Sequence, residues 1–221
     1  IRQDEGKIHD DERFGMPEGQ VLEFSGVTKR FGAVTAVSDL SARVEPGRVT
    51  GFLGPNGAGK TTTLRILLGL VRATEGTATI GGSSYAKLAH PLQTVGAVLE
   101  ASSFHPGRTG ANHLRVYARA ATISNERVDE VLGLVGLADA AGRKVGGYSL
   151  GMRQRLGIAQ AIMEEPSLLI LDEPMNGLDN QGVQEMRQLF LKLKDEGKTI
   201  LLASHSREDI AALCDTTVEI D

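Results

Sequence analysis

The fold is decided by the stretch Gly54-Pro55-Asn56-Gly57-Ala58-Gly59-Lys60-Thr61, which fits the pattern G-x-x-x-x-G-K-[ST] at every position. A short apolar run, Val49–Leu53, precedes it and predicts a buried strand, and the helical spacing of apolar residues in Lys60–Leu70 predicts a helix after it. Glycines let backbone N–H groups turn inward as an anion cradle, to which a helix N-terminus adds partial positive charge. The order of strand, loop and helix predicts a phosphate-binding loop; the alternative is a tight glycine turn without a ligand.

Two side chains of this loop have the chemistry of nucleotide binding. The Lys60 ammonium would reach the β- and γ-phosphates, and the Thr61 hydroxyl would bind Mg²⁺. The residues expected to hold the nucleotide here are Gly54, Pro55, Asn56, Gly57, Ala58, Gly59, Lys60, Thr61 and Thr62.

An acidic pair, Asp172 and Glu173, follows the apolar run Leu168–Leu171, which predicts another buried strand. The carboxyl ends of parallel strands meet at one edge of the sheet, which would place Asp172 beside the phosphate loop. There Asp172 would hold Mg²⁺ through a water, and Glu173 would polarise an attacking water. Without the phosphate loop, the same pair would be an ordinary solvated strand end.

Strand and helix patterns alternate along the rest of the chain. Further strands are expected at Val21–Phe24, Leu40–Val44, Thr77–Ile80, Val95–Leu99, Thr199–Ala203 and Thr216–Asp221, the first two as half-buried edge strands. Helices are expected at Asn112–Ala121, Glu126–Val135, Met152–Met163 and Val183–Lys194, and a further helix start at Ser206. This alternation predicts an α/β fold with a mostly parallel sheet covered on both faces, and the central helices predict an inserted helical subdomain.

The composition of the 221 residues is that of a globular protein, with 41% hydrophobic and 24% charged residues. A formal net charge of −4 argues against a broad basic surface for nucleic acid. No apolar stretch of the sequence approaches the roughly 20 residues of a membrane-spanning helix. The single cysteine, Cys214, excludes an intramolecular disulfide and a Cys-based zinc cluster, and we expect it to be a buried thiol.

A third motif, Tyr148-Ser149-Leu150-Gly151-Met152-Arg153-Gln154-Arg155, lies between the phosphate loop and the acidic pair. Taken alone it is a helix start, with Ser149 as the capping residue and an N-terminus that can face an anion. Together with its neighbours it resembles the signature of ABC-type ATPases, usually Leu-Ser-Gly-Gly-Gln, in a variant form that retains Ser149 and Gly151. The resemblance covers about residues 21–221 and implies a P-loop NTPase fold of the RecA type with an antiparallel β edge.

The resemblance assigns roles to three more residues. Phe31 matches the aromatic residue that stacks on adenine in the family, although a core aromatic would also fit the position. Asp179, in Asn176-Gly177-Leu178-Asp179, matches a loop that lies across the dimer interface. His205 matches the histidine that contacts the γ-phosphate; a lone histidine after a strand is otherwise more often structural.

Glu100 is a departure from the family pattern. The family usually has Gln at this position, where it touches Mg²⁺ and senses the membrane partner. A carboxylate also ligates Mg²⁺, so Glu100 is a candidate metal ligand together with Thr61 and Asp172. The segment from Val98 to Pro106 and the altered signature are similar to the family branch that exports bacitracin- and lantibiotic-type peptides.

The resemblance implies an ATP-hydrolysing subunit, with ATP and Mg²⁺ as cofactors, that dimerises head to tail with a second ATPase subunit. Each ATP would lie between Gly54–Thr62 of one copy and the Ser149 and Gly151 positions of the other. Glu173 would then activate water. A separate transmembrane permease, docked on a groove near Glu100–Ala121, would carry a drug or peptide antibiotic. This chain would lie at the cytoplasmic face of the membrane, and no nucleic acid is expected as a partner.

Two soluble classes of ABC ATPase are alternatives. A translation factor would carry two ATPase domains in one chain with a charged linker, whereas this sequence has one set of motifs. A DNA-maintenance ATPase would place a long coiled coil between the phosphate loop and the signature, but no sustained heptads occur between Lys60 and Ser149.

The expected domain organisation is a polar tail or linker at residues 1–20 followed by an ATPase domain at 21–221. The tail is rich in acidic side chains and poor in apolar ones. Within the ATPase domain we expect a RecA-like core at 21–100 and 166–221 and a helical subdomain at 101–165. Because the chain begins at Ile1 and ends inside a predicted strand, we also expect sequence beyond both ends.

Overall fold

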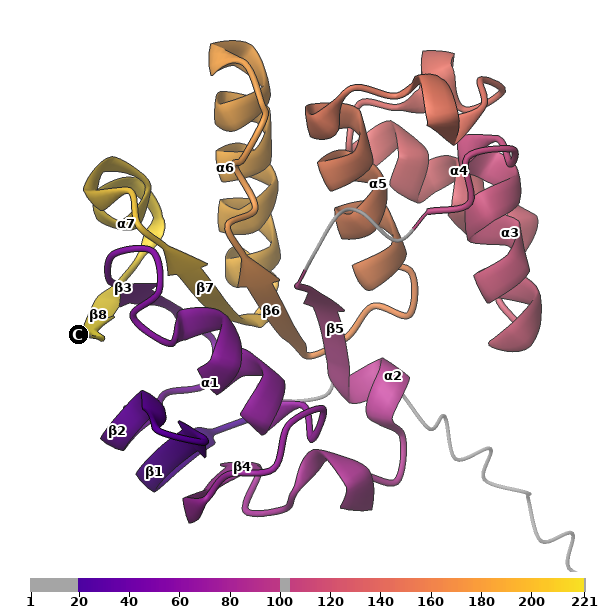
Figure 1. The fold of residues 1–221 in the computed structure, drawn as a ribbon. Helices are drawn as coiled ribbons and strands as arrows, with labels where there is room; N and C mark the ends of the chain where they lie inside the picture. Colours follow the sequence, from indigo (N-terminus) through magenta and orange to yellow (C-terminus); the bar gives the residue numbers. More distant parts are fainter. Residues whose placement is uncertain (1–19, 100–103, 221) are drawn as a thin grey trace, which may run out of the picture.

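The fold is that of a computed structural model, which describes residues 20–99 and 104–220. It has two β-sheets and a group of helices (Figure 1). The expected tail at residues 1–20 lies outside the described residues apart from Gln20, and Glu100 lies outside them as well.

The central sheet has five parallel strands, in the order β5 (Val95–Val98), β6 (Leu168–Asp172), β7 (Thr199–Ser204), β3 (Val49–Leu53) and β8 (Thr216–Glu219). Every residue of β3, β6 and β7 is buried, and this explains their largely apolar sequences. The pairing register brings the carboxyl ends of these three strands to the same edge. The expected parallel sheet is confirmed.

A second sheet is antiparallel and has the strand order β2 (Val34–Val44), β1 (Leu22–Phe31) and β4 (Glu75–Ile80). The expectation that the first two strands are both edge strands is wrong for β1, because β4 pairs with its second side. These three strands form a separate sheet, which faces the parallel sheet across helix α1 (Lys60–Leu67) (Figure 1).

Helix α1 (Lys60–Leu67) lies between the two sheets (Figure 1). Its Leu64 shares a buried core with Phe24 of β1 and Phe52 of β3, whose ring centroids are 5.5 Å apart. The helix ends before the expected Leu70, because Gly69 has a φ of +70° and turns the chain out of the helix. The helix that begins at the phosphate loop is therefore held from both sides.

The other helices are α3 (Gly110–Ala120), α4 (Asn125–Leu134), α5 (Leu150–Ala161), α6 (Asn180–Asp195) and α7 (Arg207–Leu213). Thr109, Ser124 and Ser149 cap α3, α4 and α5, each through a side-chain oxygen that accepts a hydrogen bond from a backbone N–H three residues later. Single turns at α2 (Pro91–Thr94), Tyr85–Lys87, Ala138–Ala140 and Val145–Gly147 were not expected. One turn is too short to give an apolar period.

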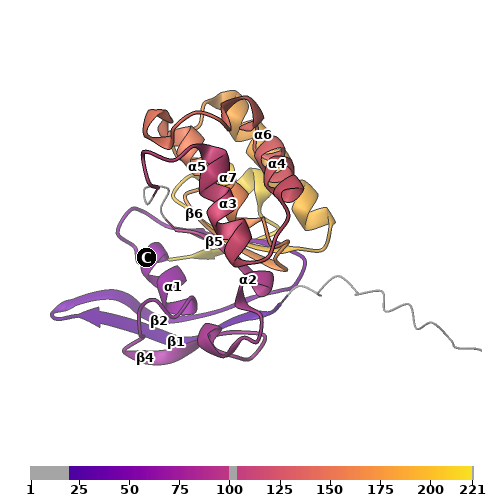
Figure 2. The same cartoon turned by 90° about the vertical axis from the view of Figure 1, so that its right-hand side faces the viewer.

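Helices α3, α4 and α5 pack against one another, and Figure 2 shows this group on the opposite side of the molecule from the antiparallel sheet. The end of α5 approaches β5 closely at Gly96, where a Cβ would overlap the carbonyl oxygen of Ala161. Within residues 20–99 and 104–220, none of the helices combines the length and the apolar character that crossing a bilayer requires.

Two titratable side chains outside the sheet edge are shielded from water. His113 of α3 is buried, and its Nε2 lies 2.9 Å from Oε1 of Gln160. Its Nδ1 has no hydrogen-bond partner among the described residues, and burial lowers the pKa of His113. Cys214 is half-buried, whereas a fully buried thiol was expected. Its partial burial still raises the pKa of Cys214 to about 12.

Candidate functional site

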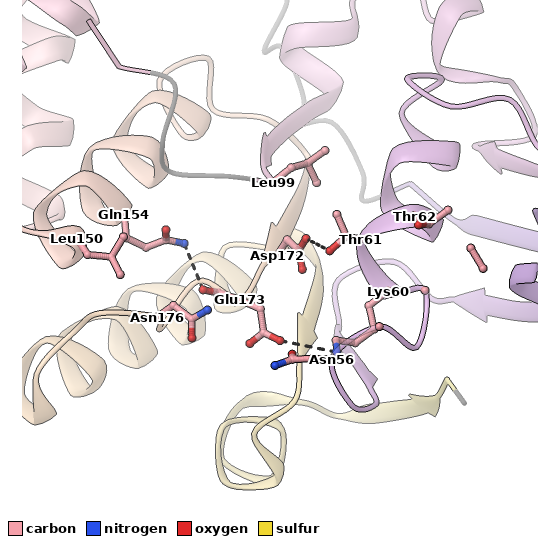
Figure 3. A pocket seen from close by; sticks show the side chains of 13 residues that line it. Asn56, Lys60, Thr61, Thr62, Leu99, Leu150, Gln154, Asp172, Glu173 and Asn176 are labelled. Carbon is pink, nitrogen blue, oxygen red and sulfur yellow. Dashed lines mark hydrogen bonds and ion pairs between the residues drawn. The ribbon is translucent and has the colours of Figure 1, made fainter. Parts of the chain in front are cut away.

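A cavity of about 480 Å³ opens at the edge of the parallel sheet where β3 and β6 end. Figure 3 shows the side chains around it. Asn56, Lys60 and Thr61 line it on the side of the phosphate loop, and Gln154, Asp172 and Glu173 line it on the other. The structure thus brings the phosphate loop and the acidic pair together, as the sequence predicts.

The shape of the phosphate loop depends on its glycines. Gly57 and Gly59 have φ values of +90° and +93°, a left-handed conformation that side chains disfavour. At Gly59 a Cβ would also overlap the carbonyl oxygen of Ala36 in β2, and at Gly54 it would overlap that of Ile220. Glycine is therefore needed at Gly57 for the backbone turn, at Gly54 for close packing, and at Gly59 for both.

Lys60 provides positive charge inside the cavity. Its side chain is only 6% exposed, and Nζ donates hydrogen bonds to the carbonyl oxygens of Gly54 (2.6 Å) and Pro55 (3.0 Å). Among the described residues, Oε1 of Glu173 is the carboxylate oxygen that pairs with Nζ, at 3.8 Å (Figure 3). A buried ammonium held this loosely by one carboxylate favours an anionic ligand in the cavity.

Asp172 and Thr61 form the second half of the site. The Thr61 hydroxyl donates a hydrogen bond of 2.5 Å to Oδ2 of Asp172, while Oδ1 is buried without a partner in the described part of the chain. Burial, followed by the charge of Glu173, raises the pKa of Asp172. The unpartnered oxygen and the unfavourable burial of its charge both fit a cation.

The donor set is that of Mg²⁺ more than of a transition metal. No cluster of three His, Cys, Asp or Glu side chains able to hold a metal occurs in the described residues. Mg²⁺ keeps several waters and usually takes one or two carboxylates together with substrate phosphates. The Thr61 hydroxyl and the Asp172 carboxylate meet that requirement.

Glu173 lies beside Asp172 with an unusual backbone conformation, a φ of +47°. Its N–H still donates to the carbonyl oxygen of Ala203 in β7 at 2.9 Å. Its carboxylate accepts hydrogen bonds from the Ser204 hydroxyl (3.3 Å) and the His205 N–H (3.0 Å). The strained turn after β6 therefore aims this carboxylate at β7 and at the cavity.

His205 lies against Glu173, with 2.9 Å between Nδ1 and Oε1. The imidazole is 47% exposed and reaches the cavity only through Glu173, which lines it. The predicted base and the predicted γ-phosphate ligand are thus in direct contact. A histidine bound to a carboxylate has a fixed ring orientation, which suits it to hold one nitrogen toward a ligand.

Gln154 is a contact that sequence reasoning missed. It lies on α5, is buried, and its Nε2 approaches the carbonyl oxygen of Glu173 at 3.4 Å (Figure 3). Ser204 was also missed. A buried glutamine in an amphipathic helix has no signature of its own, and the contact of Ser204 depends on how β7 lies beside β6. Gln154 does lie within the Tyr148–Arg155 motif, which is the one signal that could have indicated it.

Ser149, Gly151 and Asp179 lie apart from the phosphate loop. They line a second hollow of about 460 Å³ between the start of α5 and the start of α6. Ser149 Oγ accepts from the N–H of Met152 at 3.1 Å, and Asp179 Oδ1 accepts from that of Gly182 at 2.8 Å. One chain therefore does not bring these three residues to its own Lys60.

Phe31 lies at the end of β1, next to the turn into β2, and is 51% exposed. A core role for this ring is therefore excluded, and the stacking role stays a prediction. Glu100, the predicted additional metal ligand, lies outside the described residues.

Comparison with known proteins gives one consistent family. The ABC transporter family matches residues 37–176. An ABC transporter ATP-binding protein of Bacillus subtilis, YhcH, whose role is uncharacterised, is 43% identical over 88% of this chain and 65% of its own length. The bacitracin transport ATP-binding protein BcrA of Enterococcus faecalis is 41% identical over 88% and 64%. The lantibiotic transport ATP-binding protein SrtF of Streptococcus pyogenes is 35% identical over 88% and 84%. This chain therefore spans 65% of the length of YhcH and 64% of that of the Enterococcus faecalis BcrA.

Solved structures show the same fold. An ATP-binding subunit of an ABC transporter superposes with a TM-score of 0.80 and 28% identity, covering 90% of this chain and 85% of that one. A dimeric ATP-binding cassette, MJ0796, in a post-hydrolysis state with ADP and Pi, superposes with a TM-score of 0.81 over 90% and 94%. At 23% identity the second likeness concerns the fold alone.

Proposed function

The chain belongs to the ABC transporter family, and on that premise we propose that it is the ATP-binding and ATP-hydrolysing subunit of an exporter with a separate membrane permease. One observation carries the proposal: a single cavity holds the buried Lys60 ammonium, the Thr61–Asp172 pair with its unpartnered carboxylate oxygen, and the Glu173 carboxylate. These are the groups that bind a triphosphate, hold its cation and activate water.

Binding of ATP would use the groups in an order set by charge. The loop N–H groups and the start of α1 would receive the phosphates, and Lys60 would exchange its bonds to Gly54 and Pro55 for phosphate oxygens. Thr61 and Asp172 would hold Mg²⁺, which neutralises phosphate charge when bound. Phe31 would stack on adenine, since its exposed ring offers a free apolar surface.

Hydrolysis would depend on Glu173 and His205. Glu173, held by Ser204 and by the backbone N–H of His205, would accept a hydrogen bond from the attacking water. His205 would turn its free ring nitrogen toward the γ-phosphate, while Nδ1 stays on Glu173. Because both groups project from the ends of adjacent strands, their spacing is fixed by the sheet.

Dimerisation follows from the position of the second hollow. At the start of α5, the exposed Ser149 and the buried Gly151 both line this hollow, and a helix N-terminus favours an anion. The γ-phosphate bound by a second copy would fill it, with Asp179 at the same interface. ATP would then stabilise the closed dimer because it contacts both copies only in that state.

The transported substrate is proposed to be a peptide antibiotic or a drug. The names of the bacitracin and lantibiotic transport relatives support this, as does the variant signature around Ser149. A permease loop would dock near Glu100–Ala121 and hold the chain at the cytoplasmic face of the membrane. Glu100 would add a carboxylate near Mg²⁺. The RecA-like core and the helical subdomain at 101–165 would move relative to each other.

The test separates binding from turnover. Lys60→Ala should abolish MgATP binding in calorimetry, because the cavity loses its buried cation. Glu173→Gln should bind MgATP, accumulate as a dimer in size-exclusion chromatography and lose most phosphate release. Lys87→Met is the control and should change neither measurement, because this exposed lysine on the turn Tyr85–Lys87 does not line the cavity. Undiminished ATP affinity in Lys60→Ala, or undiminished turnover in Glu173→Gln, would refute the proposal.

A further inference from the structure

The ammonium of Lys29 lies over the ring of Phe31, with Nζ 4.7 Å from the ring centroid. The two residues are two positions apart on β1, where the pairing with β2 is irregular, and the contact itself places their side chains together. A cation over an aromatic face is attracted by the ring quadrupole. The contact therefore covers part of a ring that is otherwise half-exposed.

We propose that Lys29 is a positioning residue for adenine binding: it fixes the Phe31 ring and strengthens stacking of the base on the opposite ring face. The proposal rests on the proposed function, in which Phe31 receives adenine. It adds a residue that none of the sequence motifs indicated.

Lys29 is itself held in place. Its Nζ donates a hydrogen bond of 2.9 Å to the carbonyl oxygen of Arg72, in the segment after α1. Two more hydrogen bonds join β1 to the same segment. The N–H of Thr74 donates to the carbonyl oxygen of Thr28 (2.8 Å), and the N–H of Arg30 donates to the Thr74 hydroxyl (3.0 Å). The cation is thus fixed to the chain on one side and to the ring on the other.

This arrangement connects the two ends of a nucleotide site. The segment at Arg72 follows α1, and α1 begins at Lys60 of the phosphate loop. A nucleotide bound at both ends needs a fixed distance between Phe31, which would hold the base, and the phosphate loop. The Lys29 bond to the carbonyl oxygen of Arg72 joins Phe31 to the segment that follows the helix of the phosphate loop.

The electrostatics also favour stacking. The ammonium draws electron density of the ring toward the covered face, so the open face becomes a better partner for an electron-rich purine. Arg30, the neighbouring cation, pairs instead with Glu75 at 2.5 Å. It has the same charge and nearly the same position in the chain, and is therefore a matched control.

The experiment compares a ligand that has a base with one that has none. MgATP and magnesium tripolyphosphate are titrated into the whole chain by calorimetry. Lys29→Met should weaken MgATP binding about two- to fivefold, the worth of an exposed cation–π contact, and leave tripolyphosphate binding unchanged. Lys29→Arg should restore MgATP affinity, and Arg30→Met should not change the ratio of the two affinities. Melting curves confirm that each variant is folded.

Three results would overturn the inference. If Lys29→Met weakens both ligands equally, the residue acts through general charge or fold stability. If it tightens MgATP, the ammonium blocks the face that the base needs. Two further variants test the proposed function separately: Lys60→Ala should abolish binding of both ligands, and Phe31→Leu should weaken MgATP alone. If those two behave as expected and Lys29→Met has no effect, only the inference fails.

Discussion

We expect the buried carboxylate of Asp172 to lower the free energy of unfolding of the protein when no cation is bound. The side chain is buried, Oδ2 accepts from Thr61, and Oδ1 has no partner in the described residues. Burial and the adjacent charge of Glu173 raise the pKa of Asp172, so its ionised form costs folding free energy at neutral pH. Asp172→Asn removes the charge, preserves the size and keeps an oxygen that accepts from Thr61.

We expect Asp172→Asn, without Mg²⁺, to raise the free energy of unfolding by on the order of 1 kcal/mol, because it removes the buried charge while a buried polar atom remains at this position. For a chain of this size that corresponds to about 2–4 °C in Tm. The folded-state pKa of Asp172 is raised, so the gain is complete above that pKa. It disappears as pH falls below the ordinary value of 3.8, where the carboxyl is protonated in both states.

The assay is thermal unfolding in EDTA and again with ATP and Mg²⁺, over a series of pH values. The wild type should gain stability from Mg²⁺ with ATP, and Asp172→Asn should lose the Mg²⁺-dependent part of that gain. Asp195→Asn, at the exposed end of α6, is the control and should stay within about 0.5 kcal/mol of wild type. A lower Tm of Asp172→Asn in EDTA, or an intact Mg²⁺-dependent gain, would refute the reasoning.

Two further predictions concern the helices beside the sheet. Burial lowers the pKa of His113, so wild-type stability should fall as pH drops below the ordinary value of 6.5, by at most about 1.4 kcal/mol per pH unit, and His113→Leu should flatten this dependence in Tm measurements between pH 5 and 8. An unchanged slope in His113→Leu would contradict the assignment. Gly96→Ala should lose about 1–3 kcal/mol in urea unfolding because its Cβ would overlap the carbonyl oxygen of Ala161. Gly133→Ala in α4, where a Cβ meets nothing within 4 Å, should instead gain up to about 1 kcal/mol, and equal effects at both glycines would rule out the packing argument.

Local patterns predicted the elements that carry the site. The loop Gly54–Thr61, the strand before it and the helix after it are all set by glycine positions and apolar spacing within a few residues. The strand that ends at Asp172 was predicted for the same reason, since a fully buried strand has a continuous apolar sequence. Ser149 was predicted as a cap from the residues next to it, and its hydroxyl does cap α5.

Features that depend on distant segments were not predictable. The central position of β1 arises from pairing with β4, about 50 residues later in the chain, and nothing in Leu22–Phe31 itself indicates it. The contacts of Gln154 and Ser204 with Glu173 arise where α5 and β7 approach the end of β6. Such approaches are decided by the packing of whole elements, for which a single sequence has no local signal.

The separation of the phosphate-loop cavity from the Ser149 hollow has a kinetic consequence. If each chain carries two complementary halves of a site, turnover by free chains at low concentration should rise with the square of protein concentration. A permease that binds two copies would make their encounter intramolecular, at an effective concentration set by the geometry of the assembly. In that case the membrane partner would limit wasteful hydrolysis simply by deciding where two copies meet.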